Sequence, residues 1–161
     1  MDLDDVDFKA IQYLMAQGRI TWSELAGILE LSAPATADRV RRLEERNVIQ
    51  GYAALVEPKM VDCGLTAFVF ITLDKSKHRN TFLKKIQNIA EIQECHHITG
   101  EDDYLLKVRC RDTSELERLV ADELKGLAGV TKTRTTIVLS TAKETPILPV
   151  KATVQEVDPE P

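Results

Sequence analysis

The stretch TWSELAGILELSAPATADRVRRLEER, residues 21–46, decides the fold of the first part of the chain. It predicts two short helices joined by a tight turn. Thr21 and Glu24 have the Thr-x-x-Glu spacing of a capping box at the start of the first helix. Ser32 is the N-cap of the second helix, and Pro34 lies in its first turn, where a missing N–H is harmless. A turn this short, at Glu30 and Leu31, indicates a helix-turn-helix.

The second of these helices has two faces at helical spacing. We expect its inward stripe to be Ala33, Ala37, Val40 and Leu43, and its outward stripe to be Ala35, Thr36, Arg39, Arg42 and Arg46. Small side chains let a helix approach base edges closely, and arginines reach bases and phosphates in the major groove. The predicted DNA-binding residues are therefore Ser32, Ala35, Thr36, Arg39, Arg41, Arg42 and Arg46. The alternative is an ordinary solvated helix face, because residues 33–46 carry four arginines against three acids.

The residues before and after this stretch complete a small helical domain. Residues 3–17 predict a first helix, with Asp4 as N-cap, Asp7 at the third position and Gly18 after its end. Asn47 can take the left-handed conformation that ends the third helix. Residues 48–56 are β-prone and predict a wing-like strand pair or one extended strand. A hinge is expected at residues 59–64.

The second half of the chain has a different pattern. Strands are predicted at 65–73, 92–99, 104–110 and 130–139, and helices at 79–89 and after the N-cap Asp112. The order β-α-β-β-α-β is the ferredoxin-like split βαβ arrangement, so the fold class is α+β. Its antiparallel sheet carries helices on one face only. The other face is then free for dimerisation or for a ligand.

The composition excludes some classes of protein. The chain has 161 residues, 43% hydrophobic and 29% charged, with no apolar run long enough to span a membrane. The N-terminus is acidic, unlike a secretory signal, and three cysteines are an odd number for a disulfide framework. We therefore expect a cytoplasmic protein with reduced thiols. Its net charge of −5 means that a DNA-binding surface must concentrate positive charge locally.

Several short motifs carry a family resemblance. They include Leu3-Asp4-x-x-Asp7, Ser23-Glu24-Leu25-Ala26, Arg39-Val40-x-x-Leu43-Glu44, Val48-Ile49-x-Gly51-Tyr52, Glu94-Cys95-His96-His97-x-Thr99-Gly100-x-x-Asp103-Tyr104 and Thr133-Arg134-Thr135. With these motifs the chain resembles regulators of the leucine-responsive regulatory protein/AsnC family, also called feast/famine regulators, over almost all of residues 1–142. Each motif alone would be weak, but together they are specific.

The resemblance implies a domain organisation and a mode of action. It implies a winged helix-turn-helix DNA-binding domain at 1–50, a strand linker or hinge at 51–64, and a ferredoxin-like effector-binding and oligomerisation (RAM) domain at 65–142. Residues 143–161 would be an acidic, proline-containing, flexible tail. Such regulators pair through their sheets, commonly form an octamer of four dimers, and bind small effectors, typically amino acids, between dimers. The partners expected are therefore double-stranded DNA, an amino acid and further copies of the chain.

The resemblance also implies where the effector binds. Carried over by position, the effector-binding residues are Gly100, Asp102, Asp103, Tyr104, Ile137 and Val138. Gly100 lets the backbone approach a ligand, loop amides can take its carboxylate, and Asp103 can take its ammonium group. Read from the residues alone, the same stretch is an ordinary polar hairpin turn.

Other functions were weighed from the residues. Cys95-His96-His97 places only two potential ligands on one face of a strand, so no metal site is predicted. No catalytic arrangement and no phosphate-binding glycine loop is visible, so we expect neither an enzyme nor a cofactor. The remaining alternatives are a regulator that is independent of an effector or responds to redox state, through Cys63 for example, and a ligand-binding module without DNA binding.

Overall fold

The structure is a computed structural model that describes residues 3–74 and 76–150. The chain divides into two compact units. Residues 3–54 and 143–150 belong to the first unit, which we call the DNA-binding unit, and residues 55–142 form the second, the effector unit. Each unit is described by itself below.

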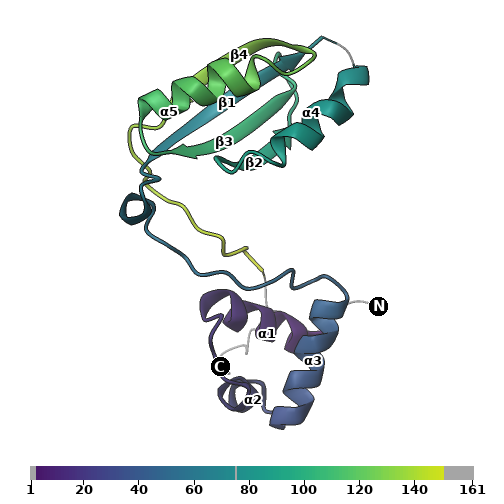
Figure 1. Ribbon diagram of the computed structural model, residues 1–161. Helices are drawn as coiled ribbons and strands as arrows, with labels where there is room; N and C mark the ends of the chain where they lie inside the picture. Colours follow the sequence, from purple (N-terminus) through teal and green to yellow (C-terminus); the bar gives the residue numbers. More distant parts are fainter. Residues whose placement is uncertain (1–2, 75, 151–161) are drawn as a thin grey trace, which may run out of the picture. The chain divides into compact units, whose positions relative to one another are not determined.

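Three helices form the DNA-binding unit: α1 (Asp5–Ala16), α2 (Trp22–Leu29) and α3 (Ala33–Glu45) (Figure 1). The predicted caps are all present. Asp4 and Asp7 form a capping box at α1, Thr21 and Glu24 form another at α2, and Ser32 caps α3. These side chains satisfy backbone N–H groups that have no partner within the helix, which is why the helices begin where the sequence indicates.

The turns between these helices use left-handed residues. Glu30 ends α2 with φ 56°, and Asn47 follows α3 with the same φ, as its short polar side chain allows. Between the helices lies a small apolar core. Its buried members are Ala10, Leu14, Leu25, Leu29 and Val40.

The segment that follows α3 differs from the expectation. Residues 48–57 form no strand in the described chain, so neither the wing-like strand pair nor the single extended strand predicted at 48–56 is present there. Gly51 interrupts the β-prone run and Pro58 follows its end, and both residue types weaken a strand. A short 3₁₀ helix, η1 (Pro58–Val61), occupies the predicted hinge.

The effector unit has the predicted order of elements. They are β1 (Leu65–Leu73), η2 (Ser76–His78), α4 (Arg79–Ile86), β2 (Ile92–His97), β3 (Tyr104–Cys110), α5 (Thr113–Arg118), the π-helical continuation η3 (Leu119–Leu124) and β4 (Val130–Ile137). The strands form one sheet in the order β2-β3-β1-β4, and all neighbouring pairs are antiparallel. This confirms the split βαβ arrangement.

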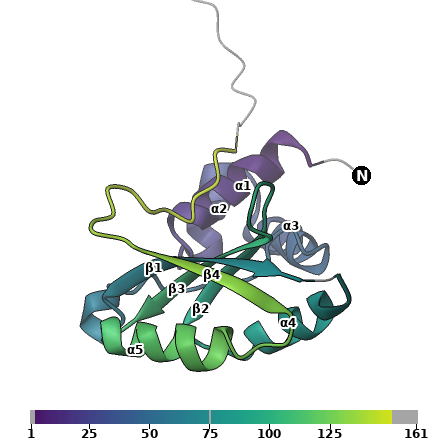
Figure 2. The ribbon, with the colours of Figure 1, turned by 90° about the horizontal axis from the view of Figure 1, so that it is seen from above.

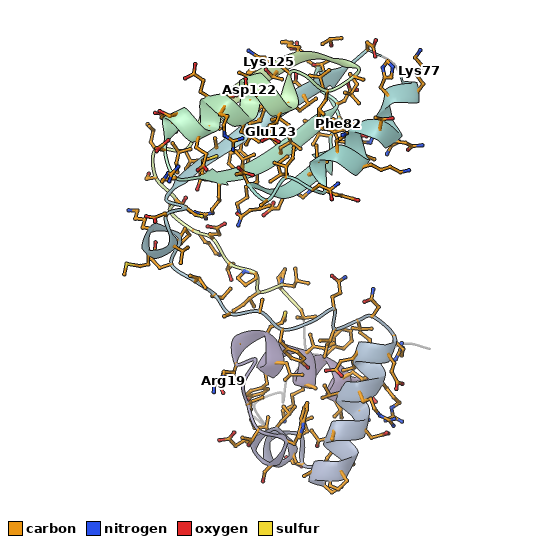
Figure 3. All side chains as sticks on the ribbon, in the orientation of Figure 1. Arg19, Lys77, Phe82, Asp122, Glu123 and Lys125 are labelled. Carbon is orange, nitrogen blue, oxygen red and sulfur yellow. The ribbon has the colours of Figure 1, made fainter. Side chains whose placement is uncertain are left out.

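Both helices of this unit, α4 and α5, cover the same face of the sheet (Figures 1 and 2). The residues beneath them alternate along each strand, as the two-residue period of a strand requires. In β3 the buried members are Tyr104, Leu106, Val108 and Cys110, and Phe82 of α4 packs against them, only 1% exposed (Figure 3).

Within the part of the chain that the structure describes, the opposite face of the sheet bears no helix. Phe68 and Phe70 of β1 lie on this face, opposite Lys107 and Leu105 of β3, and all four are partly exposed. The guanidinium of Arg134, from β4, lies 3.7 Å from the centroid of the Phe70 ring. This face is therefore a mixture of aromatic, aliphatic and cationic side chains.

The C-terminal segment returns to the DNA-binding unit. Residues 143–150 have no regular secondary structure, yet they group with the three helices and not with the sheet. The side-chain amide of Gln12, in α1, donates a hydrogen bond to the carbonyl of Val150 at 2.9 Å. The expected tail thus contributes to the first unit up to residue 150, and the rest of it lies outside the described residues.

Candidate DNA-binding and effector sites

The exposure of α3 shows which of its sides can meet a partner. Thr36, Val40 and Leu43 are buried and define the inward side. At 100° per residue, the side opposite to them carries Asp38, Arg41, Arg42 and Glu45, whose side chains are 44%, 64%, 57% and 60% exposed. Ala35 is also exposed, near the start of the helix. We call Ala35, Asp38, Arg41, Arg42 and Glu45 the outer face of α3.

Two residues are placed differently from the expectation. Thr36, predicted on the outward stripe, is completely buried, and within the described chain its hydroxyl has no hydrogen-bond partner. Ala33, predicted inward, is exposed in the first turn. The buried side of α3 runs through residues 36, 40 and 43. Helical periodicity alone does not show whether Ala33 or Thr36 is the core residue in the first turns of the helix. Thr36 is therefore removed from the candidates for DNA contact.

Arg39 is also placed differently from the expectation, because it is held by the first helix. Its Nη1 lies 2.8 Å from Oδ1 of Asp4 and 2.6 Å from Oδ1 of Asp7, and its side chain is only 21% exposed. The hydrogen bond from Arg39 lowers the pKa of the Asp4 carboxyl, and both carboxylates raise the pKa of Arg39. Arg39 joins α3 to the start of α1 and is a poor candidate for reading bases.

The remaining arginines lie where a partner can reach them. Arg41 and Arg42 on the outer face both pair with Asp38, the second at 3.4 Å, and Arg41 also lies 3.8 Å from Glu45. Arg46 is exposed at the C-cap of α3. At the other end, Ser32 is exposed and its Oγ accepts the N–H of Ala35 at 3.3 Å. Exposed pairs of this kind are weak, so phosphates can compete for the arginines.

The two aspartates of the loop between β2 and β3 are engaged within the effector unit. Asp102 is 6% exposed and accepts from the Thr72 hydroxyl at 3.1 Å and from Arg134 at 3.0 Å. The hydrogen bond from Arg134 lowers the pKa of Asp102. Asp103 accepts the backbone N–H of Leu73 at 2.7 Å. Both carboxylates therefore hold the loop against the end of β1, and Asp102 also joins it to β4.

The other predicted effector residues differ in accessibility. Gly100 has φ 122°, and a Cβ there would meet no atom within 4 Å, so its backbone is open to a ligand. Ile137 is 44% exposed at the end of β4, and the N–H of Val138 donates to the carbonyl of Thr66 at 2.9 Å. Tyr104, however, is 3% exposed and packs between the rings of Phe82 and His97. Because Tyr104 is the first residue of β3 and points to the helix side, its ring does not face the loop's open surface.

The Cys95-His96-His97 motif belongs to the sheet. His97 stacks on Tyr104, and Nε2 of His96 lies 3.0 Å from Glu94. In the described ranges, no three His, Cys, Asp or Glu side chains come together as a group able to hold a metal ion. Burial raises the pKa of Cys95, and burial together with the charges of Glu115 and Glu91 raises that of Cys110 to about 11. Neither thiol is activated for redox chemistry.

No helix of the described chain has the length and apolar character that a membrane crossing needs.

Comparisons with known proteins cover nearly the whole chain. The family model of a winged helix-turn-helix DNA-binding domain matches residues 3–50, and that of the Lrp/AsnC ligand binding domain matches residues 66–148. The leucine-responsive regulatory proteins of Klebsiella pneumoniae and Escherichia coli K12 are each 40% identical to this chain over 152 residues, which is 93% of both chains.

Solved structures agree with these matches. A transcriptional regulator of Neisseria meningitidis in complex with L-methionine superimposes with a TM-score of 0.87 at 33% identity, covering 92% of this chain and 97% of that one. A feast or famine regulatory protein of Mycobacterium tuberculosis, complexed with L-methionine, has a TM-score of 0.84 at 38% identity, with 91% and 99% covered.

Proposed function

Because the chain belongs to the Lrp/AsnC family of DNA-binding transcription regulators, we propose that its α3 enters the major groove and that an amino acid bound to its effector unit changes DNA affinity. The chain is a regulator and not an enzyme, and its second half is the family's ligand-binding domain. The surface that contacts DNA, the identity of the effector and the oligomeric state are the subjects of our proposals.

The outer face of α3 carries the DNA-binding proposal. Arg41, Arg42 and Arg46 are exposed along the helix, while Ser32 and Ala35 leave room for the backbone at its start. A homodimer would place two such helices about 34 Å apart, on successive turns of a pseudo-palindromic site. The arginines then supply phosphate contacts, which position the helix on the duplex.

Removal of one arginine tests this surface. Arg42→Ala should weaken binding to all duplexes alike and reduce the slope of log affinity against log salt by about one unit. Fluorescence anisotropy over a salt series measures both quantities. Arg118→Ala is the matched control, because this exposed arginine belongs to the effector unit. Equal affinity of the Arg42→Ala variant and the wild type would contradict docking through this face.

The effector proposal is supported by the relatives whose structures contain L-methionine. We propose that the loop at Gly100 and the end of β4, at Ile137 and Val138, take an amino acid. The open backbone at Gly100 suits a ligand carboxylate, and the exposed Ile137 suits an apolar side chain. Asp102 and Asp103 would shape the loop through the hydrogen bonds described above, and Tyr104 would support it from inside.

Calorimetry tests the effector proposal directly. Titration of the full chain with each of the twenty amino acids, methionine first, should give binding heat for one or a few of them. Gly100→Val should abolish that heat, because a branched side chain is strained at φ 122° and fills the open space. Gly27→Ala, in the other unit, should leave it unchanged. Flat heats for all twenty would overturn the proposal.

The helix-free face of the sheet supports a proposal on assembly. We propose that two chains pair through the face that carries Phe68 and Phe70, and that four such dimers form an octamer. Phe68→Glu would place a carboxylate on this face in each of the two chains and should shift the mass in sedimentation or mass photometry toward the monomer. As a regulator of transcription, the protein would act in the cytoplasm, together with the DNA that it binds.

A further inference from the structure

Asp38 lies at the centre of the outer face of α3. It is two residues after the buried Thr36 and two before the buried Val40, which turns it almost directly away from the core. Its side chain is 44% exposed. Arg41 and Arg42 lie on either side of it along the same face. If this face enters the groove, a carboxylate will be the side chain that points most directly at the bases.

The same carboxylate holds both neighbouring arginines. One oxygen of Asp38 pairs with Arg41, and the other lies 3.4 Å from Nη1 of Arg42. The hydrogen bond from Arg41 lowers the pKa of Asp38, so the group is negatively charged at neutral pH. Arg39 cannot take the place of Arg41 or Arg42 as a partner of Asp38, because Asp4 and Asp7 hold the side chain of Arg39 on the side of α1.

We propose that Asp38 is a specificity-determining residue that selects a base carrying an amino group in the major groove. The proposal rests on the docking of α3 proposed above. On DNA, phosphates compete for Arg41 and Arg42 and leave the carboxylate without its partners. It then needs a donor, and the donors in the major groove are the amino groups N4 of cytosine and N6 of adenine.

The charge of Asp38 also acts against other sequences. Where the neighbouring base edge offers only acceptors, O6 and N7 of guanine or O4 of thymine, the carboxylate is repelled and unpaired. On random DNA it keeps the arginines occupied and reduces the number of phosphates that they neutralise. Asp38 thus lowers non-specific binding and makes tight binding conditional on one base pair in each half-site.

The test uses the full chain and a random-sequence duplex pool. Rounds of binding and sequencing with the wild type define its preferred site, and the same selection is repeated with Asp38→Asn and Asp38→Ala. Asp38→Ala should lose the preference for cytosine or adenine at one position per half-site, a discrimination of about tenfold. Asp38→Asn should shift the preference at that position to adenine, because a side-chain amide pairs with both N6 and N7 of adenine. Both should also bind the unselected pool more tightly, by about fivefold at 0.15 M salt, the worth of roughly one phosphate contact.

Glu45→Gln provides the matched control. Glu45 is an exposed acid on the same face that lies 3.8 Å from Arg41, but it is nearer the end of the helix. This variant should leave the selected sequence unchanged. Circular dichroism and thermal unfolding establish that each variant is folded.

Two results would overturn the role of Asp38. One is an unchanged base preference in both Asp38 variants, which would make the residue an intrahelical ion-pair partner only. The other is an identical change in Glu45→Gln, which would reduce the effect to net charge. A wild type that binds no duplex at all would instead contradict the docking of α3, so the two failures are distinguishable.

Discussion

At the scale of single residues, Arg39 illustrates how an arginine on a DNA-binding helix can serve the fold. Asp7 is 8% exposed and lies 2.6 Å from Arg39. Arg39→Ala would leave this carboxylate without its cation, and we expect the DNA-binding unit to lose about 2 kcal/mol of unfolding free energy. Urea denaturation followed by tryptophan fluorescence measures it, because Trp22 is the only tryptophan.

Arg42→Ala is the natural comparison for that experiment. Its ion pair with Asp38 is exposed on both sides, so its loss should change stability by less than about 0.5 kcal/mol. The two substitutions should therefore have different effects: Arg39→Ala should lower stability, and Arg42→Ala should lower DNA affinity. Similar losses of stability in both variants would show that the α1–α3 ion pair has no special structural role.

Asp102 should give the effector unit a dependence on acid pH. Arg134 holds its pKa in the folded state below the ordinary value of 3.8. A lowered folded pKa stabilises the fold above pH 3.8 and loses that effect as the pH falls through the folded pKa. Asp102→Asn should thus unfold more easily at pH 7 and show a flatter stability profile below pH 4. Glu101→Gln, in the same loop, should leave the profile as in the wild type.

The buried thiol of Cys110 should be unreactive. With a pKa of about 11, roughly one molecule in a thousand carries the thiolate at pH 8. Cys110 in the folded protein should therefore react with iodoacetamide far more slowly than in urea, as measured by mass spectrometry of peptides. Comparable rates in the two conditions would reopen a redox role for this residue.

At the scale of elements, two glycines should respond to alanine in opposite directions. Gly27 lies in α2, and a Cβ there meets no atom within 4 Å, so Gly27→Ala should stabilise the unit by about 0.5–1 kcal/mol. Gly129 has φ 91°, and its Cβ would lie 2.4 Å from the Cβ of His78. Gly129→Ala should destabilise the effector unit by about 3 kcal/mol. Thermal unfolding shows whether each variant is more or less stable than the wild type.

Local signals allowed most elements to be predicted. Capping residues such as Asp4, Thr21 and Ser32 act within three residues, so the starts of α1, α2 and α3 follow from the sequence. A mostly apolar run of β-branched and aromatic residues predicted β1, and alternating apolar residues predicted β3. The π-helical turn at Leu119–Leu124 was missed, because its residues have the same apolar spacing as an α-helix.

The candidate site was harder to predict because its decisive contacts are distant in sequence. Arg39 meets Asp4 and Asp7 across more than 30 residues, and a helical wheel shows nothing of them. Helical spacing alone did not show that Thr36 is buried. Asp38, at the centre of the outer face, is not indicated by a pattern of positive charge along the helix.

At the scale of the whole molecule, the segment 143–150 should contribute to the stability of the DNA-binding unit. A chain that ends at Ala142 loses the hydrogen bond between Gln12 and Val150, and this unit should unfold more easily by about 1 kcal/mol. A chain that ends at Val150 retains the bond and is the control. Gln12→Ala should reproduce part of the loss, while Gln17→Ala, at the C-cap of the same helix, should not.

The return of residues 143–150 to the first unit also makes residues 55–142 an insertion within the sequence of that unit. Exchanging sensory modules between related regulators therefore requires two splice points, one near residue 54 and one near residue 143. A chimera made with a single crossover would give one parent's helices the other parent's terminal segment, and Gln12 would face a foreign sequence. Hybrid regulators built with both junctions should fold more reliably than those built with one.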